Sequence, residues 1–208
     1  TINNAGILNS DWYITVGGDG YETQVDPTDP NIIYSQWQYG GLVRFDKQSG
    51  ERIGIKPQPG KGEEAYRWNW DASLLISPHD PKTLFFCANK VFKTEDRGNT
   101  WKTISPDLTR QIDRNKLKVM GEVQSPDVVM KNKSTTIYGN IVAFDQSPKN
   151  AKLLYAGTDD GLIQVSNNGG ETWSKKENFS GVPNRTYVNM IKASQHDENV
   201  VYATFNNH

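Results

Sequence analysis

Short apolar runs separated by polar turns extend along the whole chain, and this alternation is typical of β-strands. Four segments repeat one order: the end of a strand, a turn rich in Pro, Asp and Asn, and then an apolar strand. They span residues 25–34, 76–85, 146–155 and 193–202. Repeats of this kind predict a β-propeller, because its four-stranded blades recur about every 40–50 residues.

The spacing of the repeats predicts how the chain is organised. The interval between Ser77 and Ser147 is longer than the other two, so we expect an insertion there. The prediction is an all-β fold, a single β-propeller region over residues 1–208 with four-stranded antiparallel blades. Its parts are blade 1 at about 17–60, blade 2 at about 66–106, the insertion at about 105–136, blade 3 at about 137–180 and a partial blade 4 at about 185–208.

The partial fourth blade predicts that the propeller is incomplete in this chain. A closed propeller typically has about 4–8 blades, since closure hides the edges of the strands. We therefore expect the 208 residues to be a fragment of a longer propeller, whose remaining blades belong to the same protein or a longer polypeptide. Within the insertion, residues 113–120 predict one short helix.

A second motif falls in phase with the repeats. Residues 94–101 and 166–173 share the pattern S/T-x-D/N-x-G-x-T-W. In such a hairpin turn Asp or Asn accepts backbone N–H bonds, Gly takes a positive φ, and Trp packs between layers. We interpret the shared positions as structural and expect them on the rim away from the channel mouth. They are Thr94, Asp96, Gly98, Thr100, Trp101, Ser166, Asn168, Gly170, Thr172 and Trp173.

These octapeptides resemble the Asp box, or BNR repeat, of sialidases, xyloglucan-cleaving propellers and the sortilin (VPS10) propeller. Further stretches resemble a bacterial group of sortilin-like BNR-repeat proteins that are often labelled glycosyl hydrolases. They are residues 16–20, 68–71, 92–98 and 157–161. The resemblance covers nearly the whole chain and implies a β-propeller from a secreted, periplasmic or cell-surface bacterial protein. It does not fix an activity, since propellers host many unrelated functions.

Composition and charge narrow the class of partner. The formal net charge is -1 and 35% of the residues are hydrophobic, which is typical of a folded domain and disfavours nucleic-acid binding. No apolar run approaches the roughly 20 residues that span a bilayer, so we expect no membrane span. The histidines are isolated and Cys87 is the single cysteine, so we expect no metal site and no cofactor.

The connections on the channel-mouth side are rich in aromatic, acidic and amide side chains, which suit a glycan, peptide or protein ligand. The candidate ligand-binding residues are Asp19, Tyr21, Trp37, Tyr39, Arg67, Trp68, Asn69, Trp70, Asp71, Tyr138, Asp159 and Asp160. Asn140, Arg185 and Tyr187 belong to the same rim. The competing interpretation is that Trp68 and Trp70 only pack between blades, while the Gly-Asp-Gly and Asp-Asp-Gly stretches only form turns.

Two functions remain open at this point. The first is a non-catalytic binding or scaffold propeller that recognises a glycan, peptide or partner protein at the channel mouth. The second is a glycoside hydrolase of the xyloglucanase-like type, which needs two carboxyl groups about 5–9.5 Å apart. Asp19, Asp71 and Asp160 are its catalytic candidates. The insertion is either a solvated excursion or a lid or docking loop.

Overall fold

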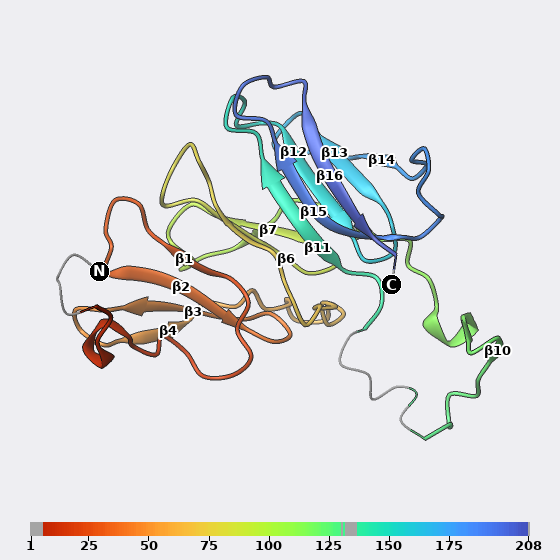
Figure 1. Ribbon diagram of the computed structural model, residues 1–208, viewed down its shortest axis with the longest axis horizontal. Coiled ribbons are helices and arrows are strands. Elements are labelled where there is room, and N and C mark those ends of the chain that lie inside the picture. Colours follow the sequence, from red (N-terminus) through yellow and green to blue (C-terminus); the bar gives the residue numbers. More distant parts are fainter. Residues whose placement is uncertain (1–5, 130, 132–136, 208) are drawn as a thin grey trace.

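The computed structural model describes residues 6–129, 131 and 137–207, which are organised almost wholly as β-strands and turns. Three four-stranded antiparallel sheets follow one another along the chain, and a two-stranded sheet lies beside the third (Figure 1). Within each sheet, strands adjacent in the sequence pair with one another. The all-β fold and the four-stranded antiparallel sheets predicted from the repeats are therefore confirmed.

The sheets are numbered 1 to 4 in chain order. Sheet 1 contains β1 (Thr23–Val25), β2 (Ile32–Trp37), β3 (Gly41–Asp46) and β4 (Arg52–Gly54). Sheet 2 contains β5 (Leu74–Ile76), β6 (Leu84–Cys87), β7 (Val91–Thr94) and β8 (Lys102–Thr103). Sheet 3 contains β11 (Ile141–Gln146), β12 (Leu154–Thr158), β13 (Ile163–Ser166) and β14 (Ser174–Lys176). Sheet 4 contains β15 (Tyr187–Ala193) and β16 (Val201–Asn206).

The repeated turn between the first and second strand of each sheet has one chemical cause. A side chain at its start accepts the backbone N–H of the residue two places further on. The acceptors are Asp26 Oδ1 and the Oγ atoms of Ser77, Ser147 and Ser194, at 2.8–3.2 Å. Such side-chain bonds reproduce a backbone turn, which is why Asp and Ser recur at this position.

The hydrophobic core lies between successive sheets as three clusters. β6 shows the principle, because Phe85 and Phe86 are adjacent and strand side chains alternate between faces. Phe86 packs in the cluster between sheets 1 and 2, whereas Phe85 packs on Phe144 of sheet 3 with ring centroids 5.2 Å apart. Cys87 is fully buried in the same cluster as Phe85. A sheet covered on both faces explains the unbroken apolar runs in the sequence.

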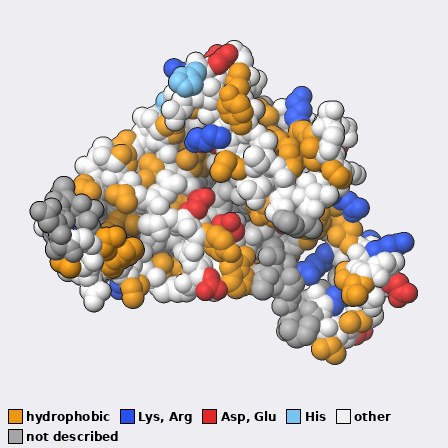
Figure 2. Space-filling model, viewed as in Figure 1, with side chains coloured by type: hydrophobic (Ala, Val, Ile, Leu, Met, Phe, Trp, Pro, Cys, Tyr) orange, Lys and Arg blue, Asp and Glu red, His pale blue; other side chains and the backbone are white. Residues whose placement is uncertain are grey.

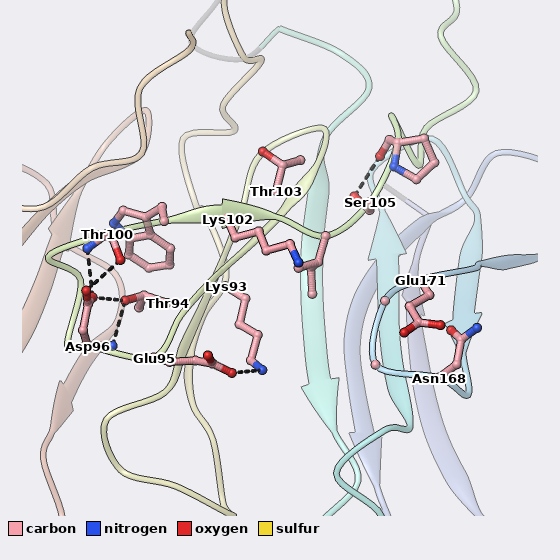
Figure 3. A pocket seen from close by; sticks show the side chains of 15 residues that line it. Lys93, Thr94, Glu95, Asp96, Thr100, Lys102, Thr103, Ser105, Asn168 and Glu171 are labelled. Atoms are coloured by element: carbon pink, nitrogen blue, oxygen red, sulfur yellow. Dashed lines mark hydrogen bonds and ion pairs between the residues drawn. The ribbon is translucent and has the colours of Figure 1, made fainter.

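The turn between β7 and β8 is held by the octapeptide's own side chains. Thr94 Oγ1 donates to Asp96 Oδ1 at 2.7 Å and accepts the N–H of Gly98 at 3.0 Å. Asp96 in turn accepts the backbone N–H of Thr100 at 2.8 Å and its hydroxyl at 2.7 Å. Figure 3 shows the bonds from Thr94 and Thr100 converging on Asp96. Together with the other polar contacts of the turn, they lower the pKa of Asp96 to about 2.

The turn between β13 and β14 repeats this geometry with a neutral residue. Ser166 Oγ accepts the N–H of Gly170 at 2.8 Å, and Asn168 Oδ1 accepts the N–H of Thr172 at 2.9 Å. Asn168 Nδ2 also donates to the Thr172 hydroxyl at 2.9 Å. The acceptor oxygen occupies the same place in both turns, so the second turn needs no ionised group.

The tryptophan of each octapeptide reaches the sheet before its own. Trp101 Nε1 donates to the carbonyl oxygen of Ile55 at 2.6 Å, and Trp173 Nε1 donates to that of Ile104 at 3.1 Å. Each of these isoleucines directly follows the last strand of the preceding sheet. The two contacts are therefore equivalent, and each fixes one sheet against its predecessor.

The insertion contains a 3-10 helix, η2 (Arg114–Lys116), and a hairpin of β9 (Lys118–Val119) and β10 (Glu122–Val123). The helix predicted over 113–120 is therefore wrong beyond a single turn. Met120 at φ 54° and Gly121 at φ 90° take left-handed conformations, which break a helix and close a tight hairpin. This part extends away from the sheets (Figure 1). Residues 130 and 132–136 of the predicted insertion, like residues 1–5 and 208, lie outside the described residues.

We expect Trp101→Phe to destabilise the protein by about 1–3 kcal/mol, because it leaves the carbonyl oxygen of Ile55 without its donor. Urea denaturation measures the change. The matched control is Trp12→Phe, whose side chain is 71% exposed and which we expect to stay within about 0.5 kcal/mol of the wild type. Equal effects of the two substitutions would contradict the structural role of the Trp101 contact.

The two octapeptides differ in their response to acid. Asp96 has a folded-state pKa of about 2 against an ordinary 3.8. Its contribution to the unfolding free energy is therefore present above about pH 4 and is lost as the pH falls toward 2. We expect Asp96→Asn to flatten the fall in unfolding free energy within this window, measured by denaturation at a series of pH values. Asn168→Asp should steepen the same fall; parallel profiles for all three proteins would count against this account.

Candidate functional site

A hollow of about 540 Å³ lies where the segments leading into the first strands of all four sheets meet, and we call it the mouth hollow. Its lining comes from the residues before β1, β5 and β11, from the loop after β12 and from the start of β15. The lining residues are Tyr21, Asn69, Trp70, Asp71, Tyr138, Asp159 and Tyr187. The structure thus brings together half of the candidate ligand-binding residues, with Tyr187 added.

Side chains hold the first strands of neighbouring sheets together. Gln24 Nε2 donates to the carbonyl oxygen of Leu74 at 3.0 Å, and Gln24 Oε1 accepts the N–H of Ile76 at 3.4 Å. Asp145 on β11 accepts the N–H of Ala193 on β15 at 2.8 Å. Side-chain bonds of this kind join first strands that belong to different sheets and, in the described chain, share no backbone hydrogen bonds. The polar segments that precede these strands therefore lie close together.

Aromatic rings line much of the mouth hollow. Tyr21 is 55% exposed, and Trp70 meets Tyr39 edge to face with ring centroids 5.2 Å apart. Burial raises the pKa of Tyr138 to about 12, and the carboxylates of neighbouring aspartates add to the effect. Burial also raises the pKa of Tyr187, with further contributions from the nearby Asp71 and Asp159. Both phenols therefore keep their protons at neutral pH and can donate hydrogen bonds to a ligand.

The two carboxylates of the mouth hollow have different surroundings. Asp159 accepts the N–H of Gly139 at 3.0 Å and, from Asn140, the backbone N–H at 2.8 Å and Nδ2 at 3.1 Å. Burial still raises its pKa to about 6, since it outweighs these bonds. The carboxylate of Asp71 is half-buried, which raises its pKa, and it has no hydrogen-bond or ion-pair partner among the described residues. Asp159 therefore shapes the loop, whereas Asp71 is available to a ligand.

A third carboxylate, Glu22, was missed from the sequence. Its Oε2 accepts the N–H of Leu74 at 2.8 Å, and burial raises its pKa to about 7, with a smaller contribution from the charge of Asp71. Side chains two apart in a strand share a face. Glu22 and Gln24 both bond to Leu74 of β5, so their spacing of two residues was the sequence pattern that could have predicted the position of Glu22.

Trp68 and Asp160, two of the predicted ligand-binding residues, do not reach the mouth hollow. Trp68 is 7% exposed and packs in the core against Phe86, with ring centroids 5.0 Å apart. Asp160 is fully buried and accepts the Thr158 hydroxyl at 2.5 Å and the N–H of Arg110 at 2.7 Å. Both are structural, so Asp160 is also removed from the catalytic candidates.

The other predicted residues lie beside the mouth hollow and are engaged elsewhere. The backbone N–H of Asp19 donates to Gln38 Oε1 at 3.0 Å, and Asp19 itself is exposed. Arg67 forms an ion pair with Asp107 at 2.7 Å. Trp37 ends β2 and does not line the hollow. The start of the insertion therefore packs along this rim through Asp107 and Arg110, and only its later part extends away.

A second, outer groove of about 790 Å³ lies between the octapeptide turns of sheets 2 and 3. Figure 3 shows Lys102 on one side and Glu171 with Asn168 on the other. Lys93 and Glu95, which also line the groove, form an ion pair with each other at 2.6 Å. The turns stand at the ends of β7 and β13 that are remote from the mouth hollow, so their polar groups cannot contribute to it.

Two negative results concern the same part of the chain. Among residues 6–129, 131 and 137–207, no three His, Cys, Asp or Glu side chains are grouped so as to hold a metal ion. Over these ranges there is also no helix with the length and apolar character that crossing a bilayer requires.

Known proteins resemble this chain over most of its length. No protein-family model matches it. An oligoxyloglucan-reducing end-specific xyloglucanase of Emericella nidulans is 25% identical over 185 residues, which is 88% of this chain and 20% of that protein. This chain thus spans about a fifth of the length of that relative.

Solved structures share the fold. The GH74 enzyme of Niastella koreensis superposes with a TM-score of 0.57 at 19% identity, covering 91% of this chain and 27% of that one. The GH74 xyloglucanase of Xanthomonas campestris gives 0.54 at 15%, covering 91% and 28%. An auxiliary nutrient binding protein of Bacteroides thetaiotaomicron gives 0.53 at 10%, covering 90% and 36%.

This chain is a β-propeller. The predicted fold is confirmed, with three four-stranded blades and two strands of a fourth among the described residues. The likeness to xyloglucanase-type propellers is confirmed for the fold. Figure 2 shows acidic and apolar side chains close to one another near the middle of one face of this propeller.

Asp159 should give the propeller a recognisable pH dependence. Between about pH 4 and pH 6 the folded state keeps the Asp159 proton that the unfolded state has lost, so the unfolding free energy falls as the pH rises. We expect Asp159→Asn to remove this part of the fall, because Asn retains an oxygen for the N–H groups of Gly139 and Asn140. Urea denaturation from pH 3.5 to pH 7 tests it. Asp96→Asn, which acts only at lower pH, is the control; identical profiles for wild type and Asp159→Asn would be the contrary result.

Proposed function

We propose that this chain is the carbohydrate-binding propeller of an extracytoplasmic protein and that the glycan lies in the mouth hollow. Sugar rings offer apolar C–H faces to aromatic side chains and hydroxyl groups to carboxylates, amides and phenols. The mouth hollow supplies both kinds of partner. Trp70 and Tyr21 provide ring surface, while Asn69, Asp71 and Tyr187 provide polar atoms.

One contrast carries this proposal. Around the rim, polar side chains are paired: Arg67 with Asp107, and Arg110 with Glu177 at 2.9 Å. Within the hollow, the carboxylate of Asp71 has no partner among the described residues. A carboxylate that lines a hollow and has no partner among the described residues is free to accept hydrogen bonds from the hydroxyl groups of a sugar.

The similar proteins support the same interpretation. Three of them are named as xyloglucan-acting or GH74 enzymes and one as a nutrient binding protein. The proposal includes a secreted, periplasmic or cell-surface bacterial location, the Asp-box character of the octapeptides, and membership of the sortilin-like BNR-repeat group. The resemblance of residues 16–20, 68–71, 92–98 and 157–161 supports that group.

A glycoside hydrolase is the second candidate function, because two carboxyl groups of raised pKa, Asp71 and Asp159, line one hollow. Of the residues first considered as catalytic, only Asp71 lines it. Binding is favoured since Asp159 is held by three N–H donors, which stabilise its anion and occupy its lone pairs. A general acid instead needs a proton directed at the glycosidic oxygen.

Trp70→Ala in the full-length protein should weaken oligosaccharide binding at least about tenfold, because a ring that stacks on sugar is lost. Isothermal titration with xyloglucan, cello- and glucosamine oligosaccharides measures it. Tyr202→Ala, a 64% exposed aromatic on β16, is the matched control and should bind as the wild type does.

Two outcomes would overturn the binding proposal. One is that no oligosaccharide binds, or that Trp70→Ala binds as tightly as the control. The other is release of reducing ends from any of these glycans by the wild type but not by Asp71→Asn, which would establish the hydrolase instead.

A further inference from the structure

The electrostatic character of the mouth hollow is one-sided. Its lining includes two carboxylates, Asp71 and Asp159, and no lysine or arginine. Glu22, whose pKa is raised to about 7 in part by the charge of Asp71, adds a third carboxyl group that is about half ionised at neutral pH. A neutral sugar would need hydrogen-bond acceptors here but would gain nothing from this concentration of negative charge.

The nearby arginines lie outside the lining of the hollow, and two of them are paired with carboxylates. Arg67 is paired with Asp107. Arg110 is held by Glu177 and by the carbonyl oxygen of Asp160, at 2.9 and 2.8 Å. The charges of Arg185, an exposed residue, and Arg110 both act on the hydroxyl of Tyr138 at one edge of the hollow. The groups whose charge acts on the Tyr187 hydroxyl are Asp71, Asp159 and Tyr21.

Aromatic rings accompany the carboxylates. Tyr21, Trp70, Tyr138 and Tyr187 belong to segments preceding or beginning the first strands of four different sheets, so they line the hollow from several sides. The face of an aromatic ring attracts a cation, most strongly where water is displaced. Rings with a carboxylate that has no partner in the described chain form a receptor for an ammonium group, which needs charge and several acceptors for its N–H bonds.

We propose that the sugar bound in the mouth hollow carries a positively charged amino group, as in an unacetylated 2-amino-2-deoxy sugar, with the ammonium against Asp71. This inference rests on the proposed carbohydrate binding and specifies its ligand. It gives a partner to the Asp71 carboxylate, which has none among the residues that the structure describes, and it uses the aromatic rings that line the same hollow. Protonation of Asp159, whose pKa is raised to about 6, should weaken the interaction with a ligand whose own charge does not change with pH.

The test uses the full-length protein and two matched ligands, the glucosamine tetramer and its N-acetylated counterpart, titrated by calorimetry at pH 7. We expect the amino form to bind at least about tenfold more tightly. Asp71→Asn should bring the two affinities within about twofold, because it removes the charge that distinguishes the two ligands, and it should leave the melting temperature unchanged. Glu171→Gln, which removes an exposed carboxylate in the outer groove, should keep the preference.

A second measurement separates the site from general attraction to an acidic surface. The ligand for this measurement is an N-trimethylated glucosamine tetramer, whose positive charge does not depend on pH. Between pH 7 and pH 5 its affinity should fall as Asp159 gains a proton, whereas that of the acetylated tetramer should stay constant. Equal affinity for the two tetramers, or tighter binding of a galacturonate tetramer through Arg185, would overturn the inference and leave carbohydrate binding intact. Binding of a lysine-rich peptide with no oligosaccharide binding would overturn both proposals.

Discussion

Face-to-face packing of successive sheets is the constraint on which this molecule depends. Sheets 2 and 3 are covered on both faces, so adjacent residues of one strand, such as Phe85 and Phe86, serve different neighbours. Burial of large side chains drives this association, while the indole N–H bonds of Trp101 and Trp173 fix how the sheets meet. A blade without its neighbours would expose both apolar faces to water.

This packing also creates the site. The first strands of neighbouring sheets are joined by side chains such as Gln24 and Asp145, and the segments ahead of them therefore meet. No single blade contains a binding surface, because each contributes one to three residues to the mouth hollow. Displacement of one sheet would misplace its share of the aromatic and acidic groups.

The sequence was informative wherever a repeat or an alternation existed. Paired repeats predicted the sheets, and the octapeptides predicted turns held by their own side chains. Trp68 and Trp70 could not be distinguished, because neither lies in a strand and alternation has no meaning there. The adjacent Asp159 and Asp160 posed the same difficulty, and only their partners Asn140 and Arg110 reveal which one reaches the hollow. Glu22 was missed since its burial depends on β5, a strand distant in sequence.

The polar contacts between blades are of two kinds, and they differ in how they would respond to duplication of a blade. Trp101 and Trp173 bond to carbonyl oxygens, which every residue possesses, so these two bonds require no particular side chain at the accepting position of the neighbouring blade. Arg97 instead pairs with Asp26 of sheet 1 at 2.8 Å, and the equivalent position in sheet 3 is Gly169. The bonds to backbone carbonyl oxygens can form between any two successive blades. The Arg97–Asp26 pair can form only where both side chains are present, so it favours one particular order of blades.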